Sequence, residues 1–154
     1  MWVPPEDRDP ICLHHPTRKT VGYFGAVRLR DGQLIVRREE GKFNGQTFWD
    51  FLQQLELGSR REGRKVVVIS DNAKYHHALL HKEWRAAQAA FVLDYLPPYS
   101  PDLNPIERVW KQTRRACLHN QYFAKLEFVV EAVARQFRAW VAPNEFLRKL
   151  CGIL

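Results

Sequence analysis

Apolar and polar positions roughly alternate in Thr20–Arg30, and this alternation predicts a β-strand with one buried face. The apolar residues of the pattern are Val21, Tyr23, Val27 and Leu29. Asp31-Gly32 is a strong turn pair, and Gln33–Arg38 is again rich in strand-forming residues. The sequence therefore predicts a β-hairpin at this point.

A helical pattern follows the hairpin in residues 44–57. Its large apolar residues recur three and four positions apart, so they share one face of a helix. These residues are Phe48, Phe51, Leu52 and Leu55. Asn44 is predicted to cap the helix, because its side chain can accept a hydrogen bond from a backbone N–H of the first turn.

A continuous β-branched run, VVVI, dominates Lys65–Ser70. A run without polar alternation is typical of a strand buried on both faces of a sheet. A helical stretch over about Tyr75–Ala90 and a short strand at Phe91–Leu96 follow. Strand, helix and strand in this order predict a parallel crossover unit.

Two more helices are predicted beyond a proline-dense loop, LPPYSPDLNP. The first begins near Pro105 and runs to about His119, and the second covers about Ala124–Val141. The succession of hairpin, helices and strands predicts an α/β fold with a mixed sheet and helices on its faces. The length of 154 residues matches one domain, so we expect residues 1–154 to form a single domain.

Charge is concentrated near the end of the chain. The formal net charge is +7, and residues 108–154 hold nine basic and three acidic side chains. A basic region of this kind indicates either a polyanion-binding surface or a solvated helix face without a partner. No apolar run approaches the ~18–20 residues that a membrane span needs, so we expect no membrane partner.

Two acidic residues, Asp71 and Glu107, lie at positions where a functional site is expected. Asp71 follows the VVVIS strand directly, at the edge where α/β sheets bind ligands. Glu107 lies in the first turn of the helix after the proline-rich loop, and the crossover can return it to the same edge. Converging carboxylates bind hard cations such as Mg²⁺ or Mn²⁺. Lys111 and Arg114 would share the face of Glu107, with Arg108 and Arg115 beside them, as a row for phosphate.

Each acid also has a structural interpretation. An Asp-Asn pair after a strand is typical of a turn. Asn104, Pro105 and Glu107 have the spacing of a capping box. Lys111 and Arg114 would then only form ion pairs with Glu107 on a solvated face. Spacing alone leaves both interpretations open.

Two motifs resemble those of a known family. VVVISDNAKYH and LPPYSPDLNPIERVWKQTRR are similar to the strand-end and proline-rich motifs of DDE transposases of bacterial insertion sequences, in the mariner-like superfamily. The resemblance implies a ribonuclease-H-like fold and metal-dependent cutting and joining of DNA with Mg²⁺ or Mn²⁺. It makes Asp71 and Glu107 catalytic metal ligands. His76 matches the motif histidine, with a role at the DNA phosphate, in orienting an acid, or in the local structure.

The sequence departs from the family pattern at its start. The family's first catalytic Asp lies on a strand upstream of the segment that Trp2–Pro5 resembles, and its helix-turn-helix modules lie further upstream. Neither has a counterpart here, so we expect a partial domain lacking its first strand, with an incomplete site. Asp7, Asp9 and Asp31 are rejected as replacements, because they lie in a loop or a hairpin turn.

The resemblance implies DNA as the partner, with a homodimer or a complementing N-terminal fragment, and a cytoplasmic, nucleoid-associated bacterial protein. We expect the chain to be inactive alone and to bind one metal ion weakly. Two other functions stay open at this point: a non-catalytic DNA-binding remnant of the same fold, and an unrelated metal nuclease. A zinc site is not expected, because His77 and His81 lack the intervening Glu of the zinc-protease motif.

Overall fold

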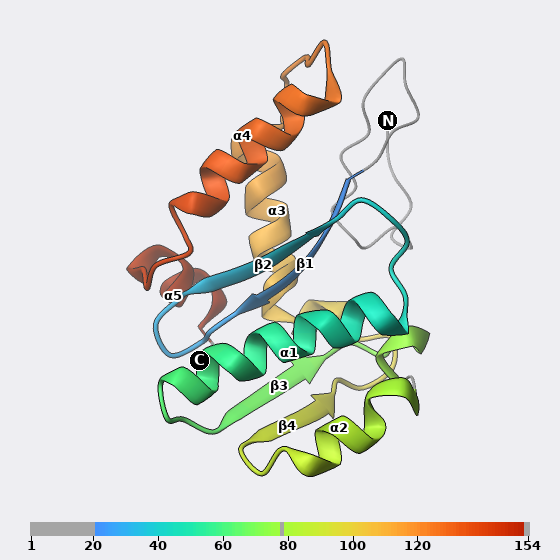
Figure 1. Ribbon diagram of the computed structural model, residues 1–154. Helices are drawn as coiled ribbons and strands as arrows, with labels where there is room; N and C mark the ends of the chain where they lie inside the picture. Colours follow the sequence, from blue (N-terminus) through green and yellow to red (C-terminus); the bar gives the residue numbers. More distant parts are fainter. Residues whose placement is uncertain (1–20, 78, 153–154) are drawn as a thin grey trace. The chain divides into compact units, whose positions relative to one another are not determined.

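The computed structural model describes residues 21–77 and 79–152 (Figure 1). In chain order the strands and helices are β1 (Gly22–Val27), β2 (Leu34–Glu39), α1 (Gly45–Arg61), β3 (Val66–Ser70), the 3₁₀ turns η1 (Lys74–His77) and η2 (Leu79–His81), α2 (Lys82–Ala87), β4 (Phe91–Tyr95), the 3₁₀ turn η3 (Pro101–Leu103), α3 (Pro105–Cys117), α4 (Leu126–Arg138) and α5 (Glu145–Cys151). None of the helices in the described ranges has the length and apolar character to cross a membrane.

The elements fall into two compact units. One contains β1, β2, α3, α4 and α5, and the other, Lys42–Asn104, contains α1, β3, α2 and β4. Each unit has its own strand pair: β1 with β2 is antiparallel and β3 with β4 is parallel. The predicted single domain over residues 1–154 stays a prediction.

The hairpin prediction is confirmed. Strands β1 and β2 pair from Gly22 opposite Glu39 to Val27 opposite Leu34. Gly32 in the turn has a φ of 75°, a conformation that residues with a Cβ rarely adopt. The Asn144 side chain donates a hydrogen bond to the Gly32 carbonyl at 2.9 Å, which ties the turn to the segment before α5.

Helix α3 packs against β1 and supplies the central residues of the core in the unit that contains β1 and β2. Val109 is fully buried and Trp110 is nearly so. The Trp110 ring fills the space beside Gly25, where a Cβ would lie 2.2 Å from its Cη2 atom. The Phe137 ring of α4 lies 6.1 Å from Trp110 and 5.1 Å from Tyr23, centroid to centroid. Glycine at position 25 therefore allows the close approach of helix and strand.

The end of the chain differs from the sequence prediction. Helix α4 ends at Arg138, three residues before the predicted end, and Val141 is 44% exposed. Helix α5, which the pattern did not predict, follows. Its N-cap is Asn144, whose side chain accepts a hydrogen bond from the Leu147 N–H at 2.8 Å. Leu147 is fully buried, so tertiary packing stabilises a helix too short to form alone.

The predicted N-cap and buried face of α1 are confirmed. The Asn44 side chain accepts from the Thr47 N–H at 3.0 Å, and the Thr47 hydroxyl accepts from the Asn44 N–H at 3.0 Å. This reciprocal pair is a capping box. The four predicted face residues are all buried: Phe48, Phe51, Leu52 and Leu55. The helix continues to Arg61, one turn beyond the predicted end.

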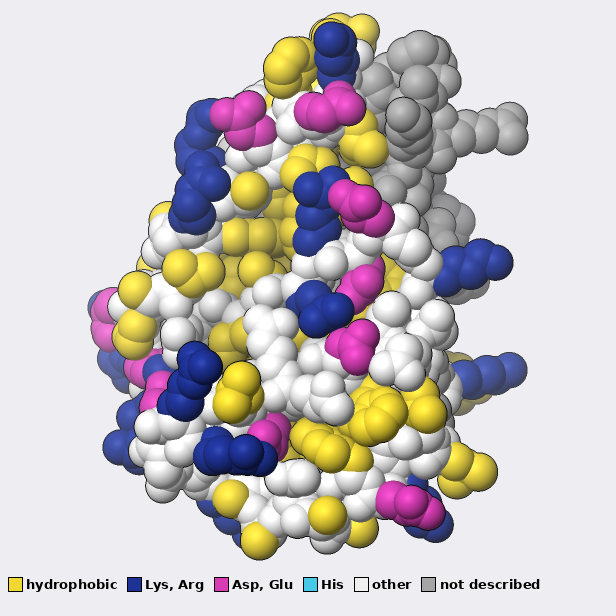
Figure 2. All heavy atoms as spheres, viewed as in Figure 1, with side chains coloured by type: hydrophobic (Ala, Val, Ile, Leu, Met, Phe, Trp, Pro, Cys, Tyr) yellow, Lys and Arg dark blue, Asp and Glu magenta, His cyan; other side chains and the backbone are white. Residues whose placement is uncertain are grey.

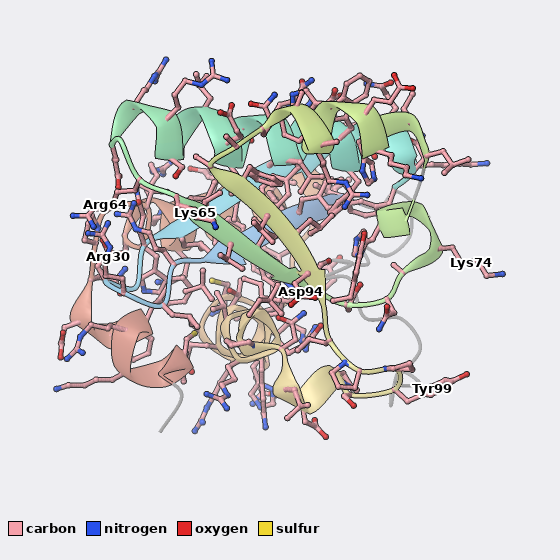
Figure 3. The ribbon with its side chains drawn as sticks, turned by 90° about the horizontal axis from the view of Figure 1, so that it is seen from below. Arg30, Arg64, Lys65, Lys74, Asp94 and Tyr99 are labelled. Atoms are coloured by element: carbon pink, nitrogen blue, oxygen red, sulfur yellow. The ribbon has the colours of Figure 1, made fainter. Side chains whose placement is uncertain are left out.

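The prediction that β3 is buried on both faces is wrong. Val67 is 56% exposed and Ile69 is 53% exposed, while the alternate residues are partly buried. In the described residues β3 and β4 form a two-stranded sheet, and α1 and α2 lie on the same side of it (Figure 3). One face of the strand is therefore covered by helices, and the other faces solvent.

The crossover between β3 and β4 is parallel, as predicted, but its helix is shorter. The predicted helix over Tyr75–Ala90 is replaced by the turns η1 and η2 and by α2, which covers only Lys82–Ala87. Both His76 and His81 are buried against the Phe48 ring. Positions five apart in a regular α-helix point about 140° away from each other, so such a helix would not direct both rings at Phe48.

Candidate functional site

Asp71 lies at the carboxyl end of β3, where the sequence placed it. Its Oδ1 atom accepts a hydrogen bond from the Ala73 N–H at 3.1 Å, which turns the chain away from the sheet. The Asp71 side chain is 41% exposed, so solvent and ligands reach the carboxylate. Part of the turn interpretation is therefore correct, but it leaves the acid accessible.

The imidazole of His76 contacts this carboxylate. Its Nδ1 atom lies 2.8 Å from Asp71 Oδ1, 3.0 Å from the Asp71 carbonyl oxygen and 2.9 Å from the Ser70 hydroxyl. The carboxylate and the carbonyl can only accept, so Nδ1 carries the proton and donates it to Asp71. Of the roles that the sequence left open for His76, the contacts favour orienting the acid.

Two elements of the same unit fix the His76 ring. The Phe48 ring of α1 lies 4.1 Å from it, centroid to centroid, and the imidazole is buried. The Tyr95 hydroxyl of β4 donates to the His76 carbonyl at 2.7 Å. Burial raises the pKa of Tyr95, which keeps the hydroxyl protonated and able to donate. The direction of the Asp71 carboxylate is thus built into the fold of this unit.

The donor chemistry of Asp71 fits a hard divalent cation. A carboxylate oxygen accepts several bonds at once, so the contacts of Oδ1 are compatible with metal binding. A hydrogen-bond donor that orients a ligand is a common feature of metal sites. Mg²⁺ often takes one or two carboxylates and completes its shell with water and substrate phosphate. In the described ranges no three His, Cys, Asp or Glu side chains form a metal-binding group.

Glu107 lies in the first turn of α3, and its side chain is partly buried. It belongs to the unit of α3, whereas Asp71 belongs to Lys42–Asn104. Their convergence on one cation therefore stays a prediction. The capping box of Asn104 and Glu107 also stays a prediction.

The basic residues of α3 divide into two groups. Lys111, Arg114 and Arg115 are exposed, and within the described part of the chain none of them forms an ion pair. The alternative in which Lys111 and Arg114 pair with Glu107 therefore has no support in the structure. On α4, by contrast, Arg135 lies 3.5 Å from Glu131, and Figure 2 shows acidic side chains among the cations of that surface.

Arg108 has a structural contact that sequence reasoning missed. Its Nη1 atom donates to the carbonyl oxygens of Leu150 and Gly152 at 3.2 and 3.4 Å, at the end of α5. A cation there satisfies carbonyls that have no partner within the helix. Its predicted role in DNA binding stays a prediction. The signal was not detectable in the sequence, because α5 itself was not predicted.

Asp31 has the contacts of a turn residue. Arg28 donates to its two carboxylate oxygens at 2.8 and 2.6 Å, and the Gln33 N–H donates at 3.2 Å. The hydrogen bond from Arg28 lowers the pKa of Asp31, so the carboxylate is ionised at neutral pH and bound within the hairpin. This supports its rejection as a third metal ligand. Asp7 and Asp9 lie outside the described residues.

Known proteins with similar sequences include transposases. A protein-family model described as DDE superfamily endonuclease matches residues 1–129. The transposable element Tcb2 transposase of Caenorhabditis briggsae is 38% identical over 77 residues, which are 46% of this chain and 28% of that protein. The insertion element IS630 uncharacterized 39 kDa protein of Shigella sonnei is 24% identical over 121 residues, which are 79% of this chain and 35% of that protein.

Solved structures with a similar fold include two of the Mos1 transposase. The paired-end complex with left transposon end aligns with a TM-score of 0.69 and 20% identity, over 98% of this chain and 45% of that one. The Mos1 strand transfer complex aligns with a TM-score of 0.65 and 22% identity, over 98% and 44%. These alignments confirm the predicted α/β, ribonuclease-H-like fold.

The chain spans about a third or less of the two curated relatives described above. The match to the family model nevertheless covers both sequence motifs, from Asp71 to Glu107 and beyond. The predicted resemblance to mariner-like DDE transposases is confirmed, and the chain belongs to the DDE superfamily endonuclease family.

Proposed function

We propose that this chain is part of the catalytic domain of a transposase that hydrolyses DNA phosphodiesters and transfers the cut strands with the help of Mg²⁺ or Mn²⁺. In this proposal Asp71 and Glu107 are the catalytic residues that the chain contributes as metal ligands. The observation that carries the proposal is the orientation of the accessible Asp71 carboxylate by the buried His76. The family match over residues 1–129 supports the same chemistry.

In this proposal the site residues have different roles: Asp71 and Glu107 bind the metal ion, and His76 orients Asp71. A bound divalent ion supplies positive charge that polarises a phosphodiester and activates water. Asp71 and Glu107 provide the anionic oxygens that such an ion requires. The Nδ1–H of His76 fixes the direction of the Asp71 carboxylate, so that it loses little side-chain freedom when a ligand binds.

DNA is the proposed partner. Lys111, Arg114 and Arg115 form an exposed row on α3, and cations that have no ion-pair partner among the described residues attract a phosphate backbone. The similar Mos1 structures are a strand transfer complex and a paired-end complex with a transposon end. We place transposon-end and target DNA, rather than RNA or a small nucleotide, as the substrates of the intact protein. We therefore propose that the protein acts at the nucleoid, in the cytoplasm of a bacterium.

The number of acids limits what the chain does alone. Two carboxylates provide fewer ligands than a two-ion site requires, so we propose that the isolated chain binds a single ion weakly and does not cleave DNA. Complete activity would then involve a homodimer or a complementing fragment that supplies a further acid.

A non-catalytic DNA-binding role is the second candidate. The exposed cations Lys111, Arg114 and Arg115, which have no ion-pair partner among the described residues, favour it. The two candidates differ in how metal affects DNA binding. If Asp71 and Glu107 hold an ion that also contacts phosphate, Mn²⁺ strengthens DNA binding. A simple basic surface gains nothing from Mn²⁺, because added salt only screens it.

The experiment measures the affinity of the chain for a labelled DNA duplex at constant ionic strength, with and without Mn²⁺. We expect Mn²⁺ to tighten binding by the native chain, and Asp71→Asn or Glu107→Gln to remove this gain while the metal-free affinity is retained. Asp102→Asn, at an exposed acid of η3, is the matched control. Equal affinities with and without Mn²⁺ would favour the non-catalytic role. Asp71-dependent nicking of a plasmid would contradict inactivity of the isolated chain.

A further inference from the structure

Tyr99 has an unusual backbone and an exposed ring. It lies in the loop between β4 and η3, with Pro97 and Pro98 before it and Pro101 after it. Its φ is 58°, in the left-handed region, and its side chain is 96% exposed. Figure 3 shows the ring projecting away from the body of the unit. It is the most exposed of the large apolar side chains in the described ranges.

Neither the local backbone nor packing accounts for a tyrosine here. The left-handed region suits glycine or asparagine and is unfavourable for a bulky residue. An exposed ring contributes almost no apolar burial that would offset the strain. The adjacent prolines restrict the loop, because each of their rings fixes φ. The result is an aromatic ring presented to solvent on a stiff loop, and strain of this kind often accompanies a ligand contact.

The loop leaves the sheet beside Asp71. The Leu96 N–H donates to the Ser70 carbonyl at 2.8 Å, and the Asn72 side chain donates to the Leu96 carbonyl. The residues on either side of Asp71 are thus bonded to the start of the loop that carries Tyr99. Lys74 follows Asp71 by three positions and is exposed. In Figure 3 Lys74 and Tyr99 extend from the same end of the β3–β4 sheet.

We propose that Tyr99 is a DNA-binding residue that stacks on an unpaired nucleobase beside the phosphodiester presented to Asp71, with Lys74 contacting a neighbouring phosphate. This inference rests on the proposed function, because it assumes DNA at the carboxyl edge of β3. Aromatic rings stack on bases whose faces are free, which requires a single-stranded or unpaired nucleotide. The preferred ligand is therefore a DNA end or junction with unpaired bases, rather than a continuous duplex.

The experiment uses a duplex with a short 3′ single-stranded overhang that contains 2-aminopurine, and a blunt duplex of the same length. Binding is measured in Ca²⁺, together with the 2-aminopurine emission. Tyr99→Gly removes the ring and suits a positive φ, so its folding is not at risk. We expect it to weaken binding of the overhang duplex about fivefold or more. It should also abolish the change in 2-aminopurine emission that binding of the native chain causes. Its binding of the blunt duplex should be unchanged.

Three further variants test the chemistry. Tyr99→Phe keeps the ring and is expected to bind like the native chain. Tyr122→Ala removes another tyrosine, which is 84% exposed, and is expected to have no effect. Lys74→Ala is expected to weaken the binding of both DNAs equally, because phosphate contacts do not depend on unpaired bases.

Native affinity and emission in Tyr99→Gly would overturn the inference, and so would a Tyr99→Phe variant as weak as Tyr99→Gly. Mn²⁺ binding by Asp71→Asn is measured on the same preparations. If Asp71→Asn binds Mn²⁺ like the native chain while Tyr99→Gly still weakens overhang binding, the proposed metal site fails and the stacking role stands. If only the Tyr99 effects are missing, the stacking role fails alone.

Discussion

His76 donates its Nδ1 proton to Asp71 at both the side chain and the backbone, at 2.8 and 3.0 Å. The imidazole is buried against Phe48, and its carbonyl accepts from the Tyr95 hydroxyl. A helix and a strand therefore determine where the Asp71 carboxylate points before any ligand arrives. Such preorganisation would favour the proposed cation, because less side-chain freedom is lost on binding.

His76→Phe tests this orientation. Phenylalanine keeps a ring against Phe48 but has no proton to donate, so the Asp71 carboxylate loses its donor. We expect the affinity for Mn²⁺ to fall by about tenfold, within the range typical for residues that orient metal ligands. Titration with Mn²⁺ followed by electron paramagnetic resonance measures the affinity.

The control for this variant is His119→Phe, at an exposed histidine after α3. It is expected to bind Mn²⁺ as the native chain does. A folded His76→Phe variant with native Mn²⁺ affinity would show that the hydrogen bond to Asp71 has no part in metal binding. Circular dichroism establishes that each variant is folded.

Gly25→Ala tests the contact of β1 with α3. A Cβ at this position would lie 2.2 Å from Cη2 of Trp110, and the buried indole has little room to move. We expect the free energy of unfolding to decrease by about 2 kcal/mol, as for other overpacked cores. Urea denaturation measures the difference.

Gly58→Ala is the matched control. Gly58 is exposed in α1, and a Cβ there meets no atom within 4 Å. Alanine favours the helix by up to about 1 kcal/mol, so this variant is expected to be more stable than the native chain. A Gly25→Ala variant that is as stable as the native chain would contradict the described position of Trp110.

The features that the sequence predicted well are those set by neighbouring residues. Asn44 and Thr47 lie three positions apart and cap α1 through their own backbone atoms. The turn at Gly32 likewise depends on local backbone conformation. The exposure of Val67 and Ile69 could not be predicted from the VVVI run, because it depends on how many layers cover the strand. Helix α5 depends on the burial of Leu147 in a core formed by distant segments.

In the candidate site, too, the features set by neighbouring residues could be predicted and those set by tertiary packing could not. The place of Asp71 was predictable, because a strand end is encoded by the run that precedes it. The orientation by His76 was not, since it requires the chain to form η1 and the ring to pack on Phe48 of α1. The structural role of Arg108 required the end of α5, where the contacted carbonyls are 42 and 44 positions away in sequence. Only three-dimensional packing brings these groups together.

The Asp31 carboxylate makes the hairpin sensitive to acid. The Arg28 guanidinium lowers the pKa of Asp31 below its ordinary value of 3.8, so the ionised form is favoured in the folded state. Its contribution to stability is therefore complete above about pH 4 and is lost as the pH falls below 3.8 and through the lowered folded pKa. We expect Asp31→Asn to reduce the free energy of unfolding by about 1 kcal/mol at pH 6 and by less at pH 3.

Urea denaturation of both proteins at the two pH values measures this. The control is the same substitution in an Arg28→Ala background, where the Arg28 guanidinium is missing and the longer contacts of Arg30 and the Gln33 N–H remain. There we expect the pH-dependent part of the effect to be smaller. An effect that grows as the pH falls would contradict the assigned direction of the pKa shift.

Lys111 and Arg114 are expected to set the salt dependence of DNA binding. Each cation that contacts a phosphate contributes about 0.9 to the slope of log affinity against log salt concentration. Lys111→Ala and Arg114→Ala should therefore each make the slope shallower by about that amount and weaken binding to all DNA sequences similarly. Fluorescence anisotropy at several salt concentrations measures the slope.

Arg135→Ala provides the comparison, because Arg135 is also exposed on a helix but lies near Glu131. Its slope is expected to match that of the native chain. If the Arg135 variant and the α3 variants change the slope equally, the binding surface is not the row on α3.

The central proposal is that Asp71 and Glu107 hold the same divalent ion. Electron paramagnetic resonance of Mn²⁺ titrated into the native chain, Asp71→Asn, Glu107→Gln and the double variant tests it most directly. If the two carboxylates share one ion, each single variant loses most of the affinity, and the double variant is hardly weaker than either. Independent, additive losses, or unchanged Mn²⁺ binding in both single variants, would contradict the claim.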